Sequence, residues 1–508
     1  MKQSLTYISL WFGVLFVGLF LRSDDLLDRP IHFDEATGAR LLGKHLEGNG
    51  FDFNPQHFHG PILAYVTAPI AKARGENSWA ELSLTTLRVS PIIAGMLLII
   101  TPLLWIREIG HRATLASSLF IATSPLIVYY NRMFIHESWL ALFGMISAAL
   151  LFQLLCKPTL RIGALTGLAM ALMFATKESF AISVLSWGGG IVIYLGYRFF
   201  TRDSNPIKDW KLYFKPGIAL VVVGFLVSAF FYTDGFRNPK GIVDAVMTYF
   251  VYETTAGHDK AFTYYLELLL WPKHLLGQWW SEGLIAILAL VGIVLAVVRK
   301  HQSRGPILFV SAIVVGHFLI YSLIGYKTPW LMVLPWCYAC LLAGMVFHAA
   351  SGLRPISEWG LYLVTALALV FQIAQSRTSS GRFANDFRNP YTYVPTSKNA
   401  QQIGSWLSTV DSTIQPLGTI AIIGQEYWPL PWYLRQFESV GYWAELPAEA
   451  ENFSVLIATP SKSAEADAML EATHTALPHG LRTNVAVTIY LKNDLWDQWI
   501  HRPETVDR

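Results

Sequence analysis

The stretch that decides the fold is "YISLWFGVLFVGLFLRSDDLLDRPIHFDEATGARLL", residues 7–42. Its apolar part, within the range 5–21, is long enough to cross the hydrocarbon core of a bilayer as one helix. One lysine precedes this run and no small-residue cleavage site follows it, so we interpret it as a retained membrane span rather than a removed signal peptide. Two adjacent acids, Asp34 and Glu35, stand just beyond the predicted membrane surface.

The whole chain has the composition of a protein that crosses a membrane many times. Of its 508 residues, 53% are hydrophobic and only 14% are charged, whereas soluble domains contain about 25% charged residues. The stretch 261–280 holds Glu267, Lys273 and His274 among its aromatic residues, which favours a helix lying in the membrane interface. The other apolar runs predict eleven spans, over residues 5–21, 82–104, 113–130, 138–155, 161–176, 180–197, 216–232, 283–298, 306–323, 331–348 and 359–374.

Lysine and arginine in the short loops predict the orientation of the chain. Cations are concentrated in alternate loops, which places those loops and the N-terminus on the cytoplasmic side of a plasma or inner membrane. The opposite loops carry few cations, notably Arg132, Lys177 and Lys327. The predicted extracytoplasmic segments are residues 22–81, 131–138, 176–179, 233–281 and 325–330. The paired acids and the lone cations therefore fall on one face.

The tail, residues 377–508, differs from the membrane part, residues 1–376. Three β-like runs, "GTIAIIG" (418–424), "FSVLIATP" (453–460) and "NVAVTIYLK" (484–492), alternate with helical patterns such as residues 397–410. This alternation predicts a small extracytoplasmic α/β domain after the last span.

Charge and cysteine content point away from a nucleic-acid partner and from a disulfide framework. The net charge is only +3, and no basic stripe is present, so we expect no nucleic-acid partner. Cys156, Cys337 and Cys340 lie in or beside apolar runs, and we expect lipid-facing or core-facing thiols rather than disulfides.

The acids and histidines of the first outer loop have more than one interpretation. Asp34 and Glu35 could act as a general base toward a hydroxyl group, hold a divalent metal, or favour the dipole of a helix that begins there. His57 and His59, in "NPQHFHGP" (54–61), could bind a phosphate, join the acids in a metal site, or lie in an ordinary loop. Their spacing matches no compact metal motif, so the sequence leaves a divalent metal cofactor open.

Three outer turns add charged candidates. Arg132 and Glu137 stand in "YYNRMFIHESWL" (129–140), where snorkelling alone would explain the arginine. Lys177 and Glu178 in "FATKESF" could be a hairpin turn with an ion pair, and Lys327 is a single cation in "GYKTPW". Ionisable groups at membrane depth are costly, which favours a function for them.

These residue types together suit the transfer of a sugar from a lipid phosphate. The departing phosphate needs cations, and the acceptor hydroxyl needs a base. Aromatic residues make up 14% of the chain, with 18 tryptophans, and could stack on sugar faces or form interfacial belts.

The segment "HFDEATGARLL" resembles the first outer loop of polyprenyl-phosphate-dependent glycosyltransferases of the GT-C fold. This group includes the protein O-mannosyltransferases of glycosyltransferase family 39 and the lipid A aminoarabinose transferase. The resemblance implies that Asp34 is the catalytic base, with Glu35 beside it. Glu137 resembles the second outer acid of the same group.

Two further segments depart from the pattern of these relatives. "HFHGPILAY" is similar to the segment where relatives carry Lys-Pro-Pro, so His59 stands in place of a lysine. "GLAMALMFATKES" is similar to their Leu-Thr-Lys-Gly-Pro turn, which maps the lysine to Lys177 and puts Glu178 in place of glycine.

A flippase-associated subfamily of predicted membrane glycosyltransferases is a closer resemblance. Its features are "DEA", "HGP", "TKE", "KTPWL" (327–331), "NPYTYVPTS" (389–397) and "EYWPLPWYLR" (426–435), which run from the first loop into the tail. The resemblance implies a helical polytopic GT-C membrane protein with a small C-terminal α/β domain.

The implied activity is inverting transfer of a hexose such as mannose from a polyprenyl-phosphate sugar to a hydroxyl of a glycan, lipid or protein acceptor. Asp34 and Glu35 would be catalytic. The donor phosphate would be bound by His59, Arg132, Lys177 and Lys327, and the acceptor would be oriented by Glu137, Glu178 and His57. A metal, if present, would take Asp34, Glu35, His57 and His59 as candidate ligands. The rival functions are a flippase for lipid-linked sugars and a non-catalytic assembly factor on the same scaffold.

Overall fold

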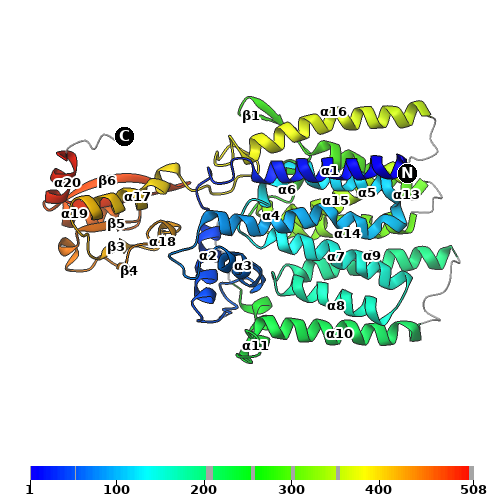
Figure 1. The fold of residues 1–508 in the computed structure, drawn as a ribbon, viewed down its shortest axis with the longest axis horizontal. Coiled ribbons are helices and arrows are strands. Elements are labelled where there is room, and N and C mark those ends of the chain that lie inside the picture. The colour runs from blue at the N-terminus through cyan, green and yellow to red at the C-terminus, as the bar shows by residue number, and fades with distance from the viewer. Residues whose placement is uncertain are drawn as a thin grey trace.

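The computed structural model describes residues 2–51, 53–201, 210–252, 258–298, 304–349 and 355–502. The molecule is elongated, with a bundle of long helices and a smaller domain at one end of the bundle (Figure 1). Helices α2 (Phe33–Leu46) and α3 (Ile62–Ala73) of the first outer loop lie at this same end, and the N-terminus lies at the opposite end (Figure 1). The first loop and the tail therefore share one face of the bundle, as the loop charges predict.

The bundle consists of apolar helices that overlap every one of the predicted spans. Among the described residues, eight helical stretches are long and apolar enough to cross a membrane, and α8 and the apolar part of α13 are shorter. The helices of the bundle are α1 (Lys2–Ser23), α4 (Leu84–Ile100), α5 (Ile106–Thr123), α6 (Pro125–Tyr130), α7 (Glu137–Cys156), α8 (Leu160–Phe174), α9 (Phe180–Phe200), α10 (Trp210–Tyr232), α13 (Gly283–Val298), α14 (Arg304–Leu323), α15 (Val333–Ala349) and α16 (Pro355–Ser380).

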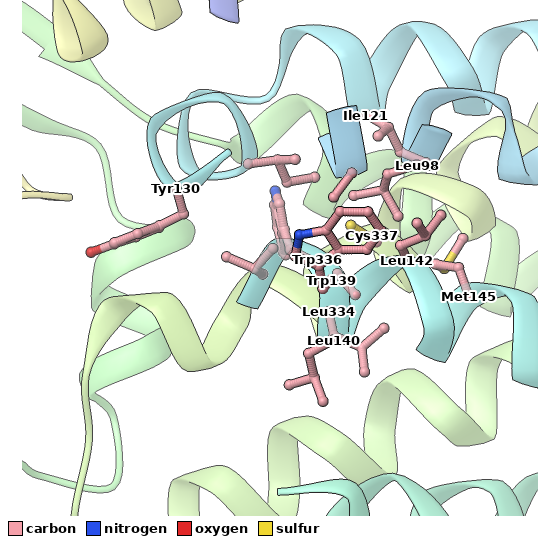
Figure 2. Packing of buried hydrophobic residues seen from close by; sticks show 14 of the residues in the cluster. Leu98, Ile121, Tyr130, Trp139, Leu140, Leu142, Met145, Leu334, Trp336 and Cys337 are labelled. Atoms are coloured by element: carbon pink, nitrogen blue, oxygen red, sulfur yellow. The ribbon is translucent and has the colours of Figure 1, made fainter. Parts of the chain in front are cut away.

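Helix α15 forms the centre of the bundle, because 94% of its apolar stretch is buried. Its side chains Leu334, Trp336 and Cys337 pack with residues of α4, α5 and α7 (Figure 2). Cys340 is also buried there, and Cys156, Cys337 and Cys340 are all free thiols in the structure.

The prediction of one interfacial helix over 261–280 is wrong. Only Tyr264–Leu269 is helical (α12), and Pro272 then precedes an antiparallel hairpin of β1 (Lys273–Leu275) and β2 (Gln278–Trp280). Leu276 and Gly277 both have positive φ in the two-residue turn, a conformation suited to tight hairpins. Proline ends the helix, and the glycine closes the turn.

The first outer loop is folded rather than extended. In α2, Ala36, Ala39 and Leu42 are fully buried and follow the helical repeat. The helix begins with a reciprocal cap, in which the His32 side chain accepts a hydrogen bond from the backbone N–H of Asp34 and the Glu35 carboxylate accepts one from the N–H of His32. This cap fixes where the two acids point. Helix α11 (Lys240–Val251) follows α10 in a later outer segment.

The tail contains a five-stranded sheet with strand order β4-β3-β5-β7-β6. Strands β3, β4 and β5 pair in parallel, and β7 pairs antiparallel to both β5 and β6. The three predicted strand regions contain β3, β5 and β7, and the predicted helix 397–410 begins at the N-cap of α17 and overlaps that helix. The elements of the tail are α17 (Lys398–Thr413), β3 (Ile420–Ile423), α18 (Leu430–Tyr433), β4 (Val440–Trp443), β5 (Val455–Ala458), α19 (Ser463–Leu470), β6 (His474–Arg482), β7 (Val485–Lys492) and α20 (Asn493–Ile500).

The division between the two parts lies later than residue 376. Helix α16 continues to Ser380, and Tyr391 of the following segment is buried in the core of the bundle, whereas the hydrophobic core of the tail begins at Ala400. The segment after α16 is therefore part of the membrane-proximal structure.

Candidate active site

A cavity of about 310 Å³ lies at the end of the bundle that bears the tail. Its walls come from α2, from the loop before α3, from the turns before α7 and α9, and from the segment that precedes α15. The charged and polar residues that line it include Asp34, His57, His59, His136, Glu137, Lys177 and His258. Residues more than 200 positions apart in the sequence thus meet around one hollow.

Asp34 lies in the first turn of α2, and its side chain is 39% exposed. One carboxylate oxygen is 3.6 Å from Nδ1 of His32, the residue that caps the helix. Residues Thr37, Gly38 and Leu41 follow Asp34 at helical spacing and line the same cavity. One face of α2 therefore presents the carboxylate to the hollow.

Glu35 does not share this position, and the prediction that it acts on substrate beside Asp34 is wrong. Its carboxylate is 0% exposed, pairs with Arg29 at 3.2 Å and Arg88 at 3.3 Å, and accepts the backbone N–H of Phe134. Burial alone would raise the pKa of Glu35, but Arg88 and Arg29 outweigh it and lower the pKa to about 2. Glu35 ties the first loop to α4 and to the turn before α7.

His59 and Glu178 form a pair on one wall of the cavity, with Nδ1 of the imidazole 2.9 Å from the carboxylate. Burial would raise the pKa of Glu178, but His59 and Lys177 outweigh it and lower this pKa to about 2. Gly60 makes the pairing possible, because a Cβ there would lie 2.2 Å from the carbonyl oxygen of Ala175. The "HGP" segment can therefore lie directly against the turn that carries Lys177 and Glu178.

Glu137 and Lys177 form a second pair, with Nζ 2.6 Å from a carboxylate oxygen. Both side chains are buried, at 3% and 6% exposure, and both line the cavity. Burial would lower the pKa of Lys177, but the carboxylates of Glu137 and Glu178 outweigh it and raise the pKa, so the lysine is charged. Lys177 has three N–H donors, so contact with Glu137 leaves donors for a ligand.

Two predicted phosphate-binding cations do not line the cavity. Arg132 donates to the carbonyl oxygen of Leu21 at 3.0 Å, and burial together with Arg29 and Arg88 lowers its pKa to about 10. Lys327 is 2% exposed and donates to the carbonyl oxygens of Lys260 and Ile324. Arg132 thus binds the backbone at the end of α1, and Lys327 binds the backbone of the segments around residues 260 and 324, which corrects the prediction that they bind the donor phosphate.

The candidate metal ligands do not come together as a group in the structure. Among the described residues, no group of three or more histidine, cysteine, aspartate or glutamate side chains is placed to hold a metal ion. Of the candidate ligands, Glu35 is bound to two arginines and His59 to Glu178, while Asp34 and His57 line the cavity. A divalent metal stays a prediction.

Several cavity residues were not predicted from the sequence. His136, Tyr252, His258 and Tyr326 line the hollow, and burial, His59 and Lys177 lower the pKa of His136 well below its ordinary value. His136 stands next to Glu137, in a turn whose charged residues the sequence analysis had singled out, so its place in the cavity could have been predicted. The aromatic residues gave no such signal, because their type is common throughout the chain.

The tail also reaches the rim of the cavity. Arg482 at the end of β6 places its guanidinium 5.4 Å from the ring centre of Phe33, the residue before Asp34. Nε2 of His32 lies 3.0 Å from the carbonyl oxygen of Tyr393. The first turn of α2 is therefore held between the bundle and the tail.

Comparison with solved structures identifies the architecture. ArnT from Cupriavidus metallidurans in the apo state matches over 96% of this chain and 98% of its own, with a TM-score of 0.62 and 14% identity. ArnT bound to undecaprenyl phosphate matches equally well, with a TM-score of 0.62. The chain has the GT-C fold.

Two other GT-C glycosyltransferases match at lower similarity. Archaeal oligosaccharyltransferase AglB from Archaeoglobus fulgidus, in complex with an inhibitory peptide and a dolichol-phosphate, has a TM-score of 0.56 and 13% identity over 99% of this chain and 75% of its own. Arabinofuranosyltransferase AftD from Mycobacteria has a TM-score of 0.50 and 13% identity over 96% of this chain and 40% of its own. No protein-family model and no curated relative matches the sequence. The fold prediction is confirmed, whereas the resemblance to family 39 and to the flippase-associated subfamily stays a prediction.

Proposed function

We propose that this protein is a membrane glycosyltransferase that moves a sugar from a polyprenyl-phosphate donor to an acceptor hydroxyl at the extracytoplasmic face. The observation that carries the proposal is that one cavity at the end of a GT-C bundle is lined by the open carboxylate of Asp34, the charged amine of Lys177 and the imidazole of His59. The lipid phosphates bound by ArnT and AglB support a donor of this chemical class.

In the proposed reaction, Asp34 takes the proton of the acceptor hydroxyl as its oxygen attacks the anomeric carbon. The bond between that carbon and the phosphate oxygen breaks on the opposite side, so the configuration inverts. The bonding electron pair stays with the departing polyprenyl phosphate, whose negative charge Lys177 stabilises. A single displacement of this kind needs one base and one anion site, and the cavity offers both.

Lys177 and His59 have different parts in holding the phosphate. Lys177 is a buried point charge whose position is set by Glu137. His59 places Nδ1 against Glu178, so Nε2 is the ring nitrogen left to reach a phosphate oxygen. Glu137 and Glu178 thereby act on the donor site through Lys177 and His59, rather than on the acceptor as the sequence suggested.

We take a hexose such as mannose as the first sugar to test. The experiment uses the purified full-length protein in lipid nanodiscs with a panel of radiolabelled polyprenyl-phosphate sugars and mixed glycan, lipid and peptide acceptors. Release of label from one donor is expected for the unaltered chain and lost in Asp34→Asn. Asp28→Asn is the matched control, because Asp28 is an exposed acid of the same loop. Donor lipid that binds but is never turned over would instead favour a flippase or an assembly factor.

A further inference from the structure

A second hollow, a groove of about 380 Å³, lies between the first outer loop and the tail. Arg40 of α2 and Trp79 of the loop after α3 form one side of it. The other side belongs to the tail and consists of Tyr427, Trp428 and Tyr442, together with neighbouring residues of the segment around α18. The groove is separate from the cavity of Asp34, since the two share no lining residue.

The aromatic side chains of this groove are positioned by contacts with one another on the tail side and by packing on α2 on the other side. The ring of Tyr427 stacks near that of Trp428 at 6.2 Å and lies 5.0 Å from that of Tyr442. Trp79 packs directly on α2, because a Cβ at Gly43 would lie 2.8 Å from the Cβ of Trp79. The groove thus has preformed aromatic walls on both sides, and ligand binding would order few side chains.

Charged groups stand at the edge of these aromatic walls. The guanidinium of Arg40 lies 5.3 Å from the ring centre of Trp79 and is exposed. Glu438, also exposed, and Arg435 line the groove on the tail side. Tyr442 on the edge strand β4 is 44% exposed. An apolar ring surface bordered by hydrogen-bonding groups of both charges suits a ligand that has apolar faces and a polar rim.

Sugar rings have this combination of surfaces. Their C–H faces pack on aromatic rings, and their hydroxyl groups both donate and accept hydrogen bonds at the edge, so they can use arginine and carboxylate alike. A lipid tail would leave these charges unused, and a free phosphate would leave the aromatic walls unused. A saccharide uses both parts of the groove.

Helix α2 connects the groove to the active cavity. Its residues Asp34, Thr37 and Leu41 face the cavity, whereas Arg40 faces the groove. Six residues of helix separate Asp34 from Arg40, a rise of about 9 Å. We propose that the groove is a binding site for a saccharide chain, and that it holds the acceptor glycan beside the catalytic cavity. That the bound saccharide is the acceptor rests on the proposed function. That the groove binds a saccharide does not.

The test measures saccharide binding with no donor present, so its outcome does not depend on whether transfer is ever found. Labelled full-length protein in nanodiscs is applied to a printed array of linear and branched glycans, and the affinity for the glycans it retains is measured by tryptophan fluorescence. Tyr442→Ala is expected to weaken binding about three- to tenfold, the effect of one aromatic contact, and Arg40→Ala is expected to weaken it as well, because it removes hydrogen-bond donors at the edge of the groove. Tyr442→Phe keeps the ring and is expected to bind like the unaltered chain.

Two further variants separate the groove from the rest of the molecule. Trp499→Ala changes a partly exposed aromatic residue of α20, which packs on β6 and β7, away from the β4 edge of the sheet. It is expected to bind normally, as is Asp28→Asn, which changes an exposed acid of the first loop. Retention of no glycan, or equal binding by Tyr442→Ala and the unaltered chain, would overturn the inference. Glycan binding without any donor turnover would overturn the proposed function alone.

Discussion

Replacing Glu35 by glutamine is expected to destabilise the protein, whereas replacing its neighbour Asp34 by asparagine is expected to remove activity and leave stability unchanged. The two carboxylates are adjacent in the sequence but face different surroundings. Glu35 is enclosed by Arg29 and Arg88, while Asp34 faces the cavity. Glutamine keeps the shape and the hydrogen-bond acceptor of Glu35 but leaves two buried guanidinium groups without their counter-charge.

The size of the effect follows from the buried network. The pKa of the Glu35 carboxyl falls from 4.5 to about 2 in the folded protein. At about 1.4 kcal/mol for each pKa unit, this difference corresponds to roughly 3 kcal/mol in favour of the folded state. Because the folded-state pKa is the lower one, this stabilisation is fully present above pH 4.5 and is lost as the pH falls toward 2. Removal of one partner from a buried ion pair costs about 3–5 kcal/mol, which agrees in magnitude.

Heat unfolding of the purified proteins in detergent, followed by tryptophan fluorescence at pH 7, measures the difference. Glu35→Gln should unfold at a clearly lower temperature, and Asp34→Asn and the control Asp28→Asn should unfold with the unaltered chain. When the scans are repeated at lower pH, between pH 5 and pH 3, the difference in unfolding temperature between Glu35→Gln and the unaltered chain should become smaller, because protonation of Glu35 removes the same charge. Equal unfolding temperatures for Glu35→Gln and Asp34→Asn at pH 7 would refute the assignment of the two acids to different roles.

Four shorter predictions concern the cavity and the topology. Lys177→Ala should raise the KM for donor at least tenfold and change the KM for acceptor little, as measured by transfer kinetics. Arg132→Ala should lower the unfolding temperature but leave the donor KM within about twofold, because its guanidinium holds backbone instead of lining the cavity. His59→Ala and Glu178→Gln should be non-additive in kcat/KM, since each acts through the other; additive losses would contradict the pairing. Asp28→Cys, in a chain without its native cysteines, should react with a membrane-impermeant maleimide from outside intact cells, and labelling only after lysis would reverse the topology.

The helical bundle could be predicted from the sequence because long apolar runs have one stable solution in a bilayer. The 3.6-residue helix satisfies every backbone group, so hydropathy alone locates the helices. The hairpin after α12 could not be predicted in this way. Its tryptophans and leucines have the same composition as an interfacial helix, and the decisive features are local: Pro272 and the positive φ of Leu276 and Gly277.

The candidate site was predicted in part, and the errors have one physical origin. The sequence shows that a charged residue lies in an outer turn near the membrane, where it is energetically costly. It does not show which way the side chain points. Arg132 and Lys327 are in the predicted turns, yet they donate to backbone carbonyl oxygens instead of lining the cavity. Arg88 illustrates the same difficulty from the other side. An arginine inside an apolar span requires a buried counter-charge, but the sequence does not say which acid supplies it. In the structure the partner is Glu35.

The two departures from the glycosyltransferase pattern explain each other. His59 stands where the resembling proteins have lysine, and Glu178 stands where they have glycine, 119 positions further along the chain. In the structure these two side chains contact one another at 2.9 Å. A glycine at 178 would leave Nδ1 of His59 without this carboxylate, and a lysine at 59 would present an ammonium group where the imidazole now lies. Because the two side chains contact each other, a change at one position alters the surroundings of the other. The two departures are therefore one structural feature of this cavity wall, and a double-mutant cycle between them measures their coupling.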